Sequence, residues 1–212
     1  IAKDYLVSSK KFKIIWNKEK QIAQTLIPDG IDLSLYYNSE NYHSHKNKST
    51  SIKDRIYFFI QDLMFRFKKH IIKRYSTGGK LLDYGSGVGN FSKFMSDNGF
   101  NVLAIEPDKG AMKTSIRKTV NTVSGLEMLI DKEDFNTITL WHVLEHIPDP
   151  HKIITELKLH LGKKGIMFIA APNLNSHDSL YYKSNWAALD VPRHLWHFTS
   201  PGLQMLMQKA GF

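Results

Sequence analysis

Three glycines at alternate positions, Gly85, Gly87 and Gly89, follow a short apolar run that includes Asp83. Glycine has no Cβ and tolerates positive φ, so a loop of this kind lets a ligand approach the backbone closely. The helix expected after the loop would offer unpaired N–H groups. The loop lacks the Gly-Lys-Ser/Thr ending of a P-loop and does not fit the G-x-G-x-x-G dinucleotide fingerprint. A carboxylate at Asp83 would repel a pyrophosphate, and it suits a ligand with an amine or a positive charge.

A second acid, Glu106, ends the next expected strand, one strand–helix–strand step beyond Asp83. An acid in this place can accept both ribose hydroxyls of an adenosine. Together the two acids indicate a nucleoside with an amino group and a positive charge. S-adenosylmethionine is a molecule of that kind.

The stretch His142–His146 spells H-x-x-E-H, the pattern of the inverted metallopeptidases. Presenting both histidines to zinc would need a long regular helix. Here the stretch directly follows an expected strand, and Pro148 leaves barely a turn of helix after His146. We therefore expect no metal site, and a role for these side chains in the structure or in a cofactor pocket.

The elements that would position these residues alternate along the chain. Strands are expected at 80–84, 101–106, 119–124, 135–140 and 165–171, with helices at 91–98, 109–118 and 150–161. Strands that alternate with helices predict an α/β fold with a doubly wound, Rossmann-like sheet. The fully apolar last strand fits the interior of a parallel sheet.

Residues 1–77 differ from the rest in both pattern and charge. Short strands at 4–7, 12–16 and 22–27 predict a β-hairpin region over 1–30, and 31–77 holds a Tyr-rich segment and a helix. In that helix, apolar residues recur at steps of three and four: Ile52, Ile56, Phe59, Ile60, Leu63, Phe67, Ile71 and Tyr75. We expect this side to pack on the adjoining domain and the basic side to face solvent. A membrane-surface or nucleic-acid helix is the alternative.

Composition limits the classes of function. The 212 residues include no Cys, which excludes disulfides, thiolate metal sites and Cys nucleophiles. The formal charge is +9, of which residues 1–77 contribute +8 and residues 78–212 only +1. The longest strongly apolar stretch, 166–172, is too short to cross a bilayer, and no secretory signal is apparent. We expect a cytoplasmic protein.

Four stretches, in order along the chain, resemble motifs of the class I S-adenosylmethionine-dependent methyltransferases. Asp83–Gly89 resembles the cofactor loop, and Ala104–Asp108 the ribose-binding strand end. Thr139–Asp149 and Gly165–Asn173 resemble the fourth- and fifth-strand motifs. The resemblance covers about residues 36–212 and is closest to bacterial enzymes related to ubiquinone-type O-methyltransferases and sugar methyltransferases.

The resemblance implies a cofactor site for S-adenosylmethionine, with S-adenosylhomocysteine as its product. Asp83 would hold the methionine amino end, Glu106 would bind the ribose hydroxyls, and Trp141 would close the pocket near the methionine. The residues implied on the cofactor side are Asp83, Gly85, Ser86, Gly87, Gly89, Phe91, Glu106, Pro107, Asp108, Ser124, Gly125, Leu126, Trp141 and His142.

The acceptor would lie beside residues 186–201, which follow the fifth strand. Methyl transfer from a sulfonium mostly requires proximity and orientation, but a hydroxyl acceptor must also lose a proton. Histidine is the usual base near neutral pH, so we expect His194, ahead of His146, as the catalytic base. The expected substrate residues are Tyr42, Trp186, Arg193 and His197. The alternative is that these histidines and Arg193 tie the loop to the sheet.

Other parts of the chain are interpreted through the same resemblance. The segment with Tyr36, Tyr37 and Tyr42 would fold over the cofactor as a lid. The N-terminal hairpin has no Cys with which to form the zinc ribbon of some relatives. A helix with a capping residue at Thr199 ends the chain, and the family's sixth and seventh strands do not follow, so 78–212 is expected to be a C-terminally incomplete methyltransferase domain.

The sequence thus predicts an S-adenosylmethionine-dependent enzyme that methylates a small-molecule hydroxyl. The alternatives are an RNA or protein methyltransferase, a nucleoside-binding domain without catalysis, and an α/β oxidoreductase. Nucleic acid is not the expected partner, because the positive charge is confined to the first third.

Overall fold

The computed structural model describes residues 1–37, 52–129 and 134–212, and the chain divides into two compact units. The first unit comprises Ile1–Tyr42, His142–Lys158 and Ile169–Phe212, and the second comprises His43–Trp141 and Leu159–Phe168. The domain boundaries expected from the sequence stay predictions. Among the described residues, no helix is long and apolar enough to cross a membrane.

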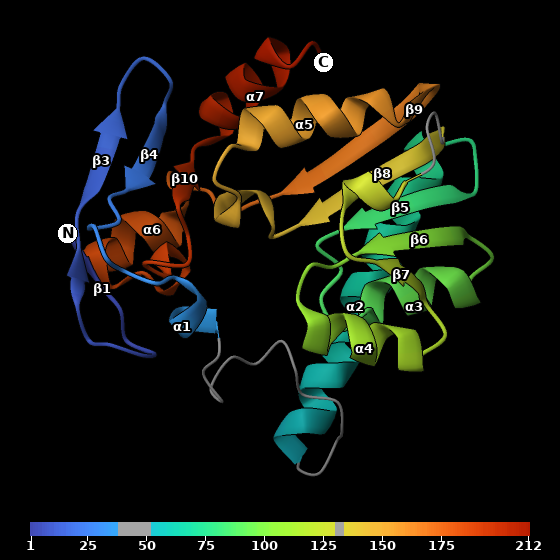
Figure 1. Ribbon diagram of the computed structural model, residues 1–212, viewed down its shortest axis with the longest axis horizontal. Coiled ribbons are helices and arrows are strands. Elements are labelled where there is room, and N and C mark those ends of the chain that lie inside the picture. Colours follow the sequence, from blue (N-terminus) through green and yellow to red (C-terminus); the bar gives the residue numbers. More distant parts are fainter. Residues whose placement is uncertain (38–51, 130–133) are drawn as a thin grey trace. The chain divides into compact units, whose positions relative to one another are not determined.

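The second unit is built on a five-stranded sheet in the order β7-β6-β5-β8-β9 (Figure 1). Its strands are β5 (Lys80–Tyr84), β6 (Asn101–Ile105), β7 (Asn121–Val123), β8 (Phe135–Trp141) and β9 (Leu161–Ala170). β5 pairs in parallel with β6 and β8, and β6 in parallel with β7. The strand order reverses between β5 and β8, where doubly wound folds bind ligands at the carboxyl ends of their strands. The predicted α/β Rossmann-like fold is confirmed.

Helices α2 (Ile52–Tyr75), α3 (Asn90–Asp97) and α4 (Lys109–Arg117) accompany this sheet, with a short 3₁₀ turn at Leu126–Met128. The C-terminal end of α3 is formed by Gly99 at φ 87°, where the Gly99 and Phe100 amides donate to the Ser96 and Met95 carbonyls. This is the Schellman pattern that glycine favours. The core of the unit consists of Ile72, Leu81, Phe91, Met95, Phe100 and Val102.

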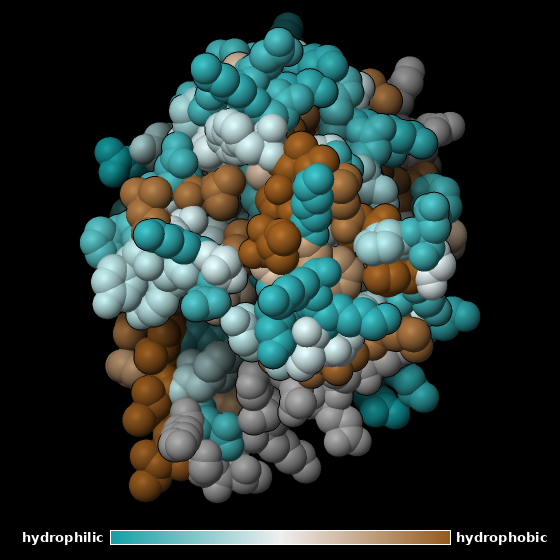
Figure 2. All heavy atoms as spheres, turned by 90° about the vertical axis from the view of Figure 1, so that its left-hand side faces the viewer, coloured by the Kyte–Doolittle hydropathy of each residue, from teal (hydrophilic) through white to brown (hydrophobic). Residues whose placement is uncertain are grey.

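The face of α2 that packs on the unit is not the predicted one. Phe65 contacts the rings of Phe91 and Phe94, and Ile72 is fully buried in the core. The apolar residues expected to be buried are exposed instead: Ile52, Ile56, Phe59, Ile60, Leu63, Phe67 and Tyr75. Apolar side chains are visible at the lower end of the molecule in Figure 2, where α2 lies in Figure 1. The periodicity identified the helix, but the packing partners of its C-terminal half decided which face is buried.

The first unit contains two small antiparallel sheets. Strands β3 (Ile14–Asn17), β4 (Ile22–Thr25) and β10 (Trp196–Phe198) form one sheet with β4 in the middle, and β1 (Ala2–Lys3) pairs with β2 (Lys11–Phe12) in the other. The helices of this unit are α1 (Ser34–Tyr37), α5 (Pro150–Leu159), α6 (His177–Tyr182) and α7 (Ser200–Lys209), with 3₁₀ turns at Leu144–His146, Lys183–Asn185 and Ala187–Leu189. The Thr199 hydroxyl accepts from the Gly202 amide, so the predicted cap of α7 is confirmed.

The secondary structure differs from the prediction at three places. Residues 4–7 form a turn instead of a strand, because the Asp4 carboxylate accepts hydrogen bonds from the Leu6, Val7 and Ser8 amides. The strand β10 was not expected. The helix expected over 150–161 ends at Leu159, because the strand β9 already begins at Leu161.

Candidate functional site

The glycine loop follows β5 directly and adopts a conformation that needs glycine. Gly85, Gly87 and Gly89 have φ of 71°, 56° and 74°, in the left-handed region. The amides of Gly85 and Ser86 donate to the Ile105 carbonyl at 2.9 and 3.0 Å, which ties the loop to the end of β6. A Cβ on Gly89 would lie 2.2 Å from Ser115 Oγ, so a side chain there would collide with α4.

Asp83 lies buried at the centre of the sheet beside this loop. The Ser92 hydroxyl donates to its Oδ2 at 2.5 Å, and the Thr139 hydroxyl to its Oδ1 at 2.8 Å. Burial raises the pKa of Asp83 to about 6, although both hydrogen bonds and the charge of Lys68 favour the ionised form. A cationic ligand would add to the counter-charge of Lys68 and favour the ionised form further.

Lys68 on α2 is a functional candidate that the sequence analysis missed. Its Nζ lies 4.3 Å from the centroid of the Trp141 ring and 5.4 Å from that of Phe91. Burial lowers the pKa of Lys68, while the charge of Asp83 acts in the opposite direction. The sequence did contain a signal for this residue. Lys68 lies four positions before Ile72 and so on the same side of α2, and a cation on a buried side needs a partner.

Glu106 directly follows β6 and is buried next to the glycine loop. Its Oε2 accepts from the Gly87 amide at 2.7 Å, and its Oε1 accepts from the Asp108 amide at 2.9 Å. Asp108 in turn caps α4, since its Oδ1 accepts from the Ala111 amide at 2.7 Å. The backbone thus holds the Glu106 carboxylate in place at the carboxyl end of β6, and Pro107 and Asp108 are exposed after it.

The remaining cofactor-side residues lie at the ends of the neighbouring strands. Ser124, Gly125 and Leu126 follow β7, which pairs with β6, and Trp141 ends β8, which pairs with β5. Among the described residues, the Ser86 hydroxyl and Trp141 Nε1 are buried without a hydrogen-bond partner. Such unsatisfied groups fit a site that a polar ligand completes. The predicted His142 belongs to the other unit, where its amide donates to the Ala170 carbonyl at 2.8 Å.

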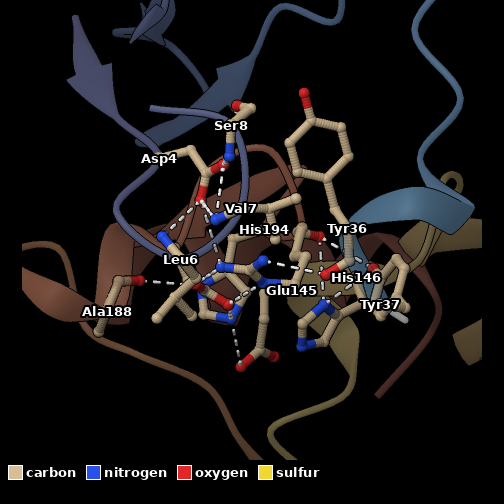
Figure 3. Close-up of polar contacts among 12 residues, drawn as sticks. Asp4, Leu6, Val7, Ser8, Tyr36, Tyr37, Glu145, His146, Ala188 and His194 are labelled. Carbon is tan, nitrogen blue, oxygen red and sulfur yellow. Dashed lines mark hydrogen bonds and ion pairs between the residues drawn. The ribbon is translucent and has the colours of Figure 1, made fainter. Parts of the chain in front are cut away.

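The first unit brings together Glu145, His146 and His194, which Figure 3 shows converging. The two imidazole rings lie 4.6 Å apart, edge to face. The Glu145 side chain is fully buried, and neither of its oxygens accepts a hydrogen bond from the described residues. Its nearest basic atoms are His142 Nδ1 at 3.5 Å and His194 Nε2 at 4.0 Å. Burial raises the pKa of Glu145, but the neighbouring histidines and its own backbone outweigh this and hold the pKa below its usual value.

The tautomers of the two histidines follow from their carbonyl partners. His194 Nδ1 lies 2.8 Å from the Ala188 carbonyl, and His146 Nδ1 lies 3.1 Å from the Arg193 carbonyl. The Tyr37 hydroxyl also lies 3.2 Å from His146 Nδ1, and it donates to the same Arg193 carbonyl at 3.3 Å. A carbonyl only accepts, so each Nδ1 carries the proton and each Nε2 is the basic nitrogen. In His194, Nε2 faces two carboxylates, at 3.9 Å from Asp190 Oδ2 and 4.0 Å from Glu145. His146 Nε2 makes no hydrogen bond with the described residues, and burial lowers the pKa of His146 to about 4.

The same three side chains have the spacing of a metal site, which the sequence analysis did not expect. Glu145, His146 and His194 each offer one ligand atom, and these atoms lie within 4.8 Å of one another. A carboxylate and two imidazoles are ligands that zinc and other transition metals accept. These ligands do not need the long regular helix that the H-x-x-E-H pattern requires. Glu145 and His146 lie in the 3₁₀ turn Leu144–His146, and His194 comes from a loop distant in sequence.

The predicted substrate residues are placed as follows. Arg193 is buried, where its Nε donates to Asp190 Oδ2 at 2.9 Å and its Nη1 to the Tyr36 carbonyl at 3.0 Å. His197 is buried against Thr25, whose Oγ1 lies 2.8 Å from Nε2, and burial lowers the pKa of His197 to about 4. Trp186 is half-buried against the core of the first unit. Tyr42 lies outside the described residues, as does part of the predicted lid, and the substrate roles stay predictions.

The comparisons with known proteins agree with this geometry. A family model described as a methyltransferase domain matches residues 57–212. The ubiquinone biosynthesis O-methyltransferase of Glaesserella parasuis is 32% identical over 109 residues, which cover 45% of this chain and 46% of that protein. Its namesake in Pelagibacter ubique is 32% identical over 126 residues, with 56% and 52% covered. The chain spans about half the length of these curated relatives.

Solved structures share the fold. A methyltransferase from Thermotoga maritima, described as a possible histamine N-methyltransferase, has a TM-score of 0.59 at 18% identity and covers 76% of both chains. A methyltransferase from Archaeoglobus fulgidus has a TM-score of 0.55 at 21% identity, with 74% of both chains covered. The sheet order, the glycine loop and the two acids define a class I S-adenosylmethionine-dependent methyltransferase domain. This chain belongs to that methyltransferase family, whose cofactor is S-adenosylmethionine.

Proposed function

We propose that the protein transfers the methyl group of S-adenosylmethionine to a hydroxyl of a small molecule. The observation that carries the proposal is the placement of Asp83 and Glu106 at adjacent strands around a left-handed glycine loop. Support for a hydroxyl acceptor comes from the relatives, which are named ubiquinone biosynthesis O-methyltransferases.

The proposed cofactor contacts use both ends of the ligand. Asp83 would accept from the methionine ammonium, and Lys68, close enough to interact electrostatically with Asp83, would meet the methionine carboxylate. Glu106 would accept from the ribose hydroxyls, while Asp108 and the segment from Ser124 would border the adenine. A zwitterionic amino-acid end thus matches an acid and a base that are already buried together.

The cofactor supplies an activated methyl group and leaves as a neutral thioether. The chain's own contribution is orientation and removal of the acceptor proton. His146 is the better placed base: Nδ1 is held by the Arg193 carbonyl, and Nε2 can receive the proton. His194 is the base expected first from the sequence, but both of its ring nitrogens face protein groups. Its role would be to orient the side chains around it.

A second use of the same cluster has its own support. The buried, unbonded Glu145 carboxylate with two imidazoles could hold a divalent cation, which would bind and acidify the acceptor hydroxyl. Dialysis against a chelator distinguishes the two: activity lost on chelation and restored by a divalent metal favours the cation, whereas unchanged activity favours the free base.

The proposal is tested by calorimetry and turnover. Titration with S-adenosylmethionine, S-adenosylhomocysteine and NAD should show binding of the first two only. Incubation with methyl-labelled cofactor and a panel of phenols, catechols and sugars should then label one class of hydroxyl. Binding of NAD alone would refute the cofactor assignment, and labelling of RNA or protein instead of small molecules would refute the acceptor class. Cofactor binding with no acceptor turned over would point to a domain without catalysis.

A further inference from the structure

The exposed apolar face of α2 has no part in the proposed methyl transfer. Its apolar residues follow one another at helical steps of three and four: Ile52, Ile56, Phe59, Ile60, Leu63 and Phe67. They are 48–77% exposed. Met64 and Tyr57, exposed by 47% and 50%, widen the face on one side. A contiguous exposed face of this size on a soluble domain marks an interaction surface.

The buried and exposed faces of α2 are separate. Phe65, Lys68 and Ile72 lie on one side of the helix and meet the core of the second unit. Figure 1 shows the N-terminal half of α2 running past the sheet, so the opposite side stands clear of the unit's other described elements. Substituting residues on that exposed side therefore leaves the core contacts of α2 in place.

Positive charge borders the apolar face. Arg55, Arg66 and Lys73 are all exposed, and spacings of eleven and eighteen residues place them on the same side of a helix of 3.6 residues per turn. Arg66 also pairs with the exposed Asp62 at 2.6 Å. The helix as a whole has seven Lys and Arg residues against two Asp. An apolar face bordered by cations matches a surface that is apolar inside and anionic outside.

We propose that α2 binds the surface of an anionic lipid bilayer, with its axis in the plane of the interface. The face around Phe59 and Phe67 would enter the boundary between headgroups and acyl chains, and the edge with Arg55 and Lys73 would meet lipid phosphates. A second copy of the chain fits less well, because pairing two such helices would bring their excess positive charges together. Nucleic acid would use the cations and leave the bulky apolar residues exposed to water.

Vesicle flotation tests the proposal without any need for enzyme activity. The full chain should float with vesicles of phosphatidylglycerol and phosphatidylcholine in equal parts, and less well with phosphatidylcholine alone or at high salt. The double variant Phe59→Ser with Phe67→Ser should bind both kinds of vesicle about tenfold or more weakly. Arg55→Gln should weaken binding about fivefold to the anionic vesicles and leave the neutral ones unaffected.

The matched control is Ile116→Ser, which removes an apolar side chain that is also half or more exposed, from α4 in the same unit. It should bind vesicles like the parent, and circular dichroism should show that all variants remain folded. Failure of the parent to float, or flotation that survives loss of both phenylalanines, would overturn the proposal. Sedimentation that shows a dimer dissolved by Phe59→Ser would also overturn it, in favour of a second copy. None of these outcomes depends on whether the methyl acceptor has been identified.

Discussion

At the scale of single residues, the site rests on charges held inside the protein. Within the described part of the chain, Asp83 has only hydroxyl donors within hydrogen-bond distance, and burial raises its pKa, which favours the neutral form. Burial lowers the pKa of Lys68, which favours its neutral form as well. A ligand with both an ammonium and a carboxylate would supply an opposite charge to each of the two side chains. Glu106, the residue proposed to bind the ribose, differs, because its carboxylate already accepts hydrogen bonds from backbone amides.

Glu106→Ala should weaken S-adenosylhomocysteine binding about ten- to hundredfold, because one or two hydrogen bonds between a carboxylate and the ribose are lost. Titration calorimetry measures the change. Asp97→Ala, which removes an exposed acid from α3, serves as the control and should bind like the parent. Unchanged affinity in the Glu106 variant would contradict the ribose assignment.

Lys68→Met should raise the dissociation constant of S-adenosylhomocysteine about tenfold while leaving 5′-methylthioadenosine binding within about twofold. The second ligand lacks the amino-acid end, and methionine preserves the contacts of the stem with Trp141 and Phe91. Lys69→Met is the neighbouring control, since Lys69 donates to Asn98 instead. Equal weakening for both ligands would mean that Lys68 acts on the fold of the pocket and not on the carboxylate.

Local patterns predicted Asp83 and Glu106, because each closes a strand at a fixed place in the strand–loop–helix unit. Lys68 was not predicted because its burial depends on which face of α2 packs on the unit, and α2 has apolar residues on two faces. His146 and His194 were recognised as candidates, but their order could not be predicted from the sequence. The Ala188 carbonyl that orients His194 is set by a loop conformation that leaves no local signature.

At the scale of elements, the glycine loop illustrates two different needs for glycine. Gly87 has a positive φ but open space where a Cβ would go, whereas Gly89 has both a positive φ and Ser115 in the way. Gly87 is thus needed for the conformation of the turn. Gly89 is needed also because α3 begins close to α4.

Gly87→Ala should therefore destabilise the cofactor-free protein by about 1–2 kcal/mol, the cost of the left-handed conformation. Gly89→Ala should cost more, about 3–5 kcal/mol, because the collision with Ser115 adds to that strain. Urea unfolding of the two variants measures the difference. Equal costs would show that Ser115 moves aside freely.

The elements that the sequence predicted well are those decided by short-range signals. Helix α2 begins and ends at the predicted residues, and the strand β5 also matches. The strand expected at 4–7 was wrong because the Asp4 carboxylate accepts hydrogen bonds from the amides that strand pairing would need. The strand β10 was missed because its partner β4 lies more than 170 residues away in sequence.

At the scale of the whole molecule, one buried group in each unit makes the stability depend on pH, and the two groups act in opposite directions. The pKa of Asp83 in the folded state is about 6, above the ordinary value of about 3.9, so its contribution to stability falls as pH rises from about 4 to 6. The pKa of His197 is about 4, below the ordinary value of about 6.5, so its contribution is present above about pH 6.5 and is lost as pH falls toward 4.

Two variants separate these contributions. Asp83→Asn should gain up to about 3 kcal/mol relative to the parent above pH 6 and little near pH 4. His197→Gln, which keeps a donor for Thr25, should gain relative to the parent only on acidification, by up to about 3 kcal/mol. Urea unfolding across this range measures both, and slopes of the same sign in the two variants would contradict the assignment.

The buried Asp83 has one more consequence, for the energetics of cofactor uptake. Near pH 6 about half of the free protein carries a proton on this carboxylate, and an incoming ammonium would expel it. Binding would then release up to about half a proton into the buffer. The measured heats in phosphate and in imidazole, which both buffer near this pH, would differ by that fraction of the difference between the two buffers' heats of protonation. Cofactor binding would thus be linked to proton release, and the proton would return when the ligand leaves. Asp83→Asn would make the calorimetric heat independent of the buffer.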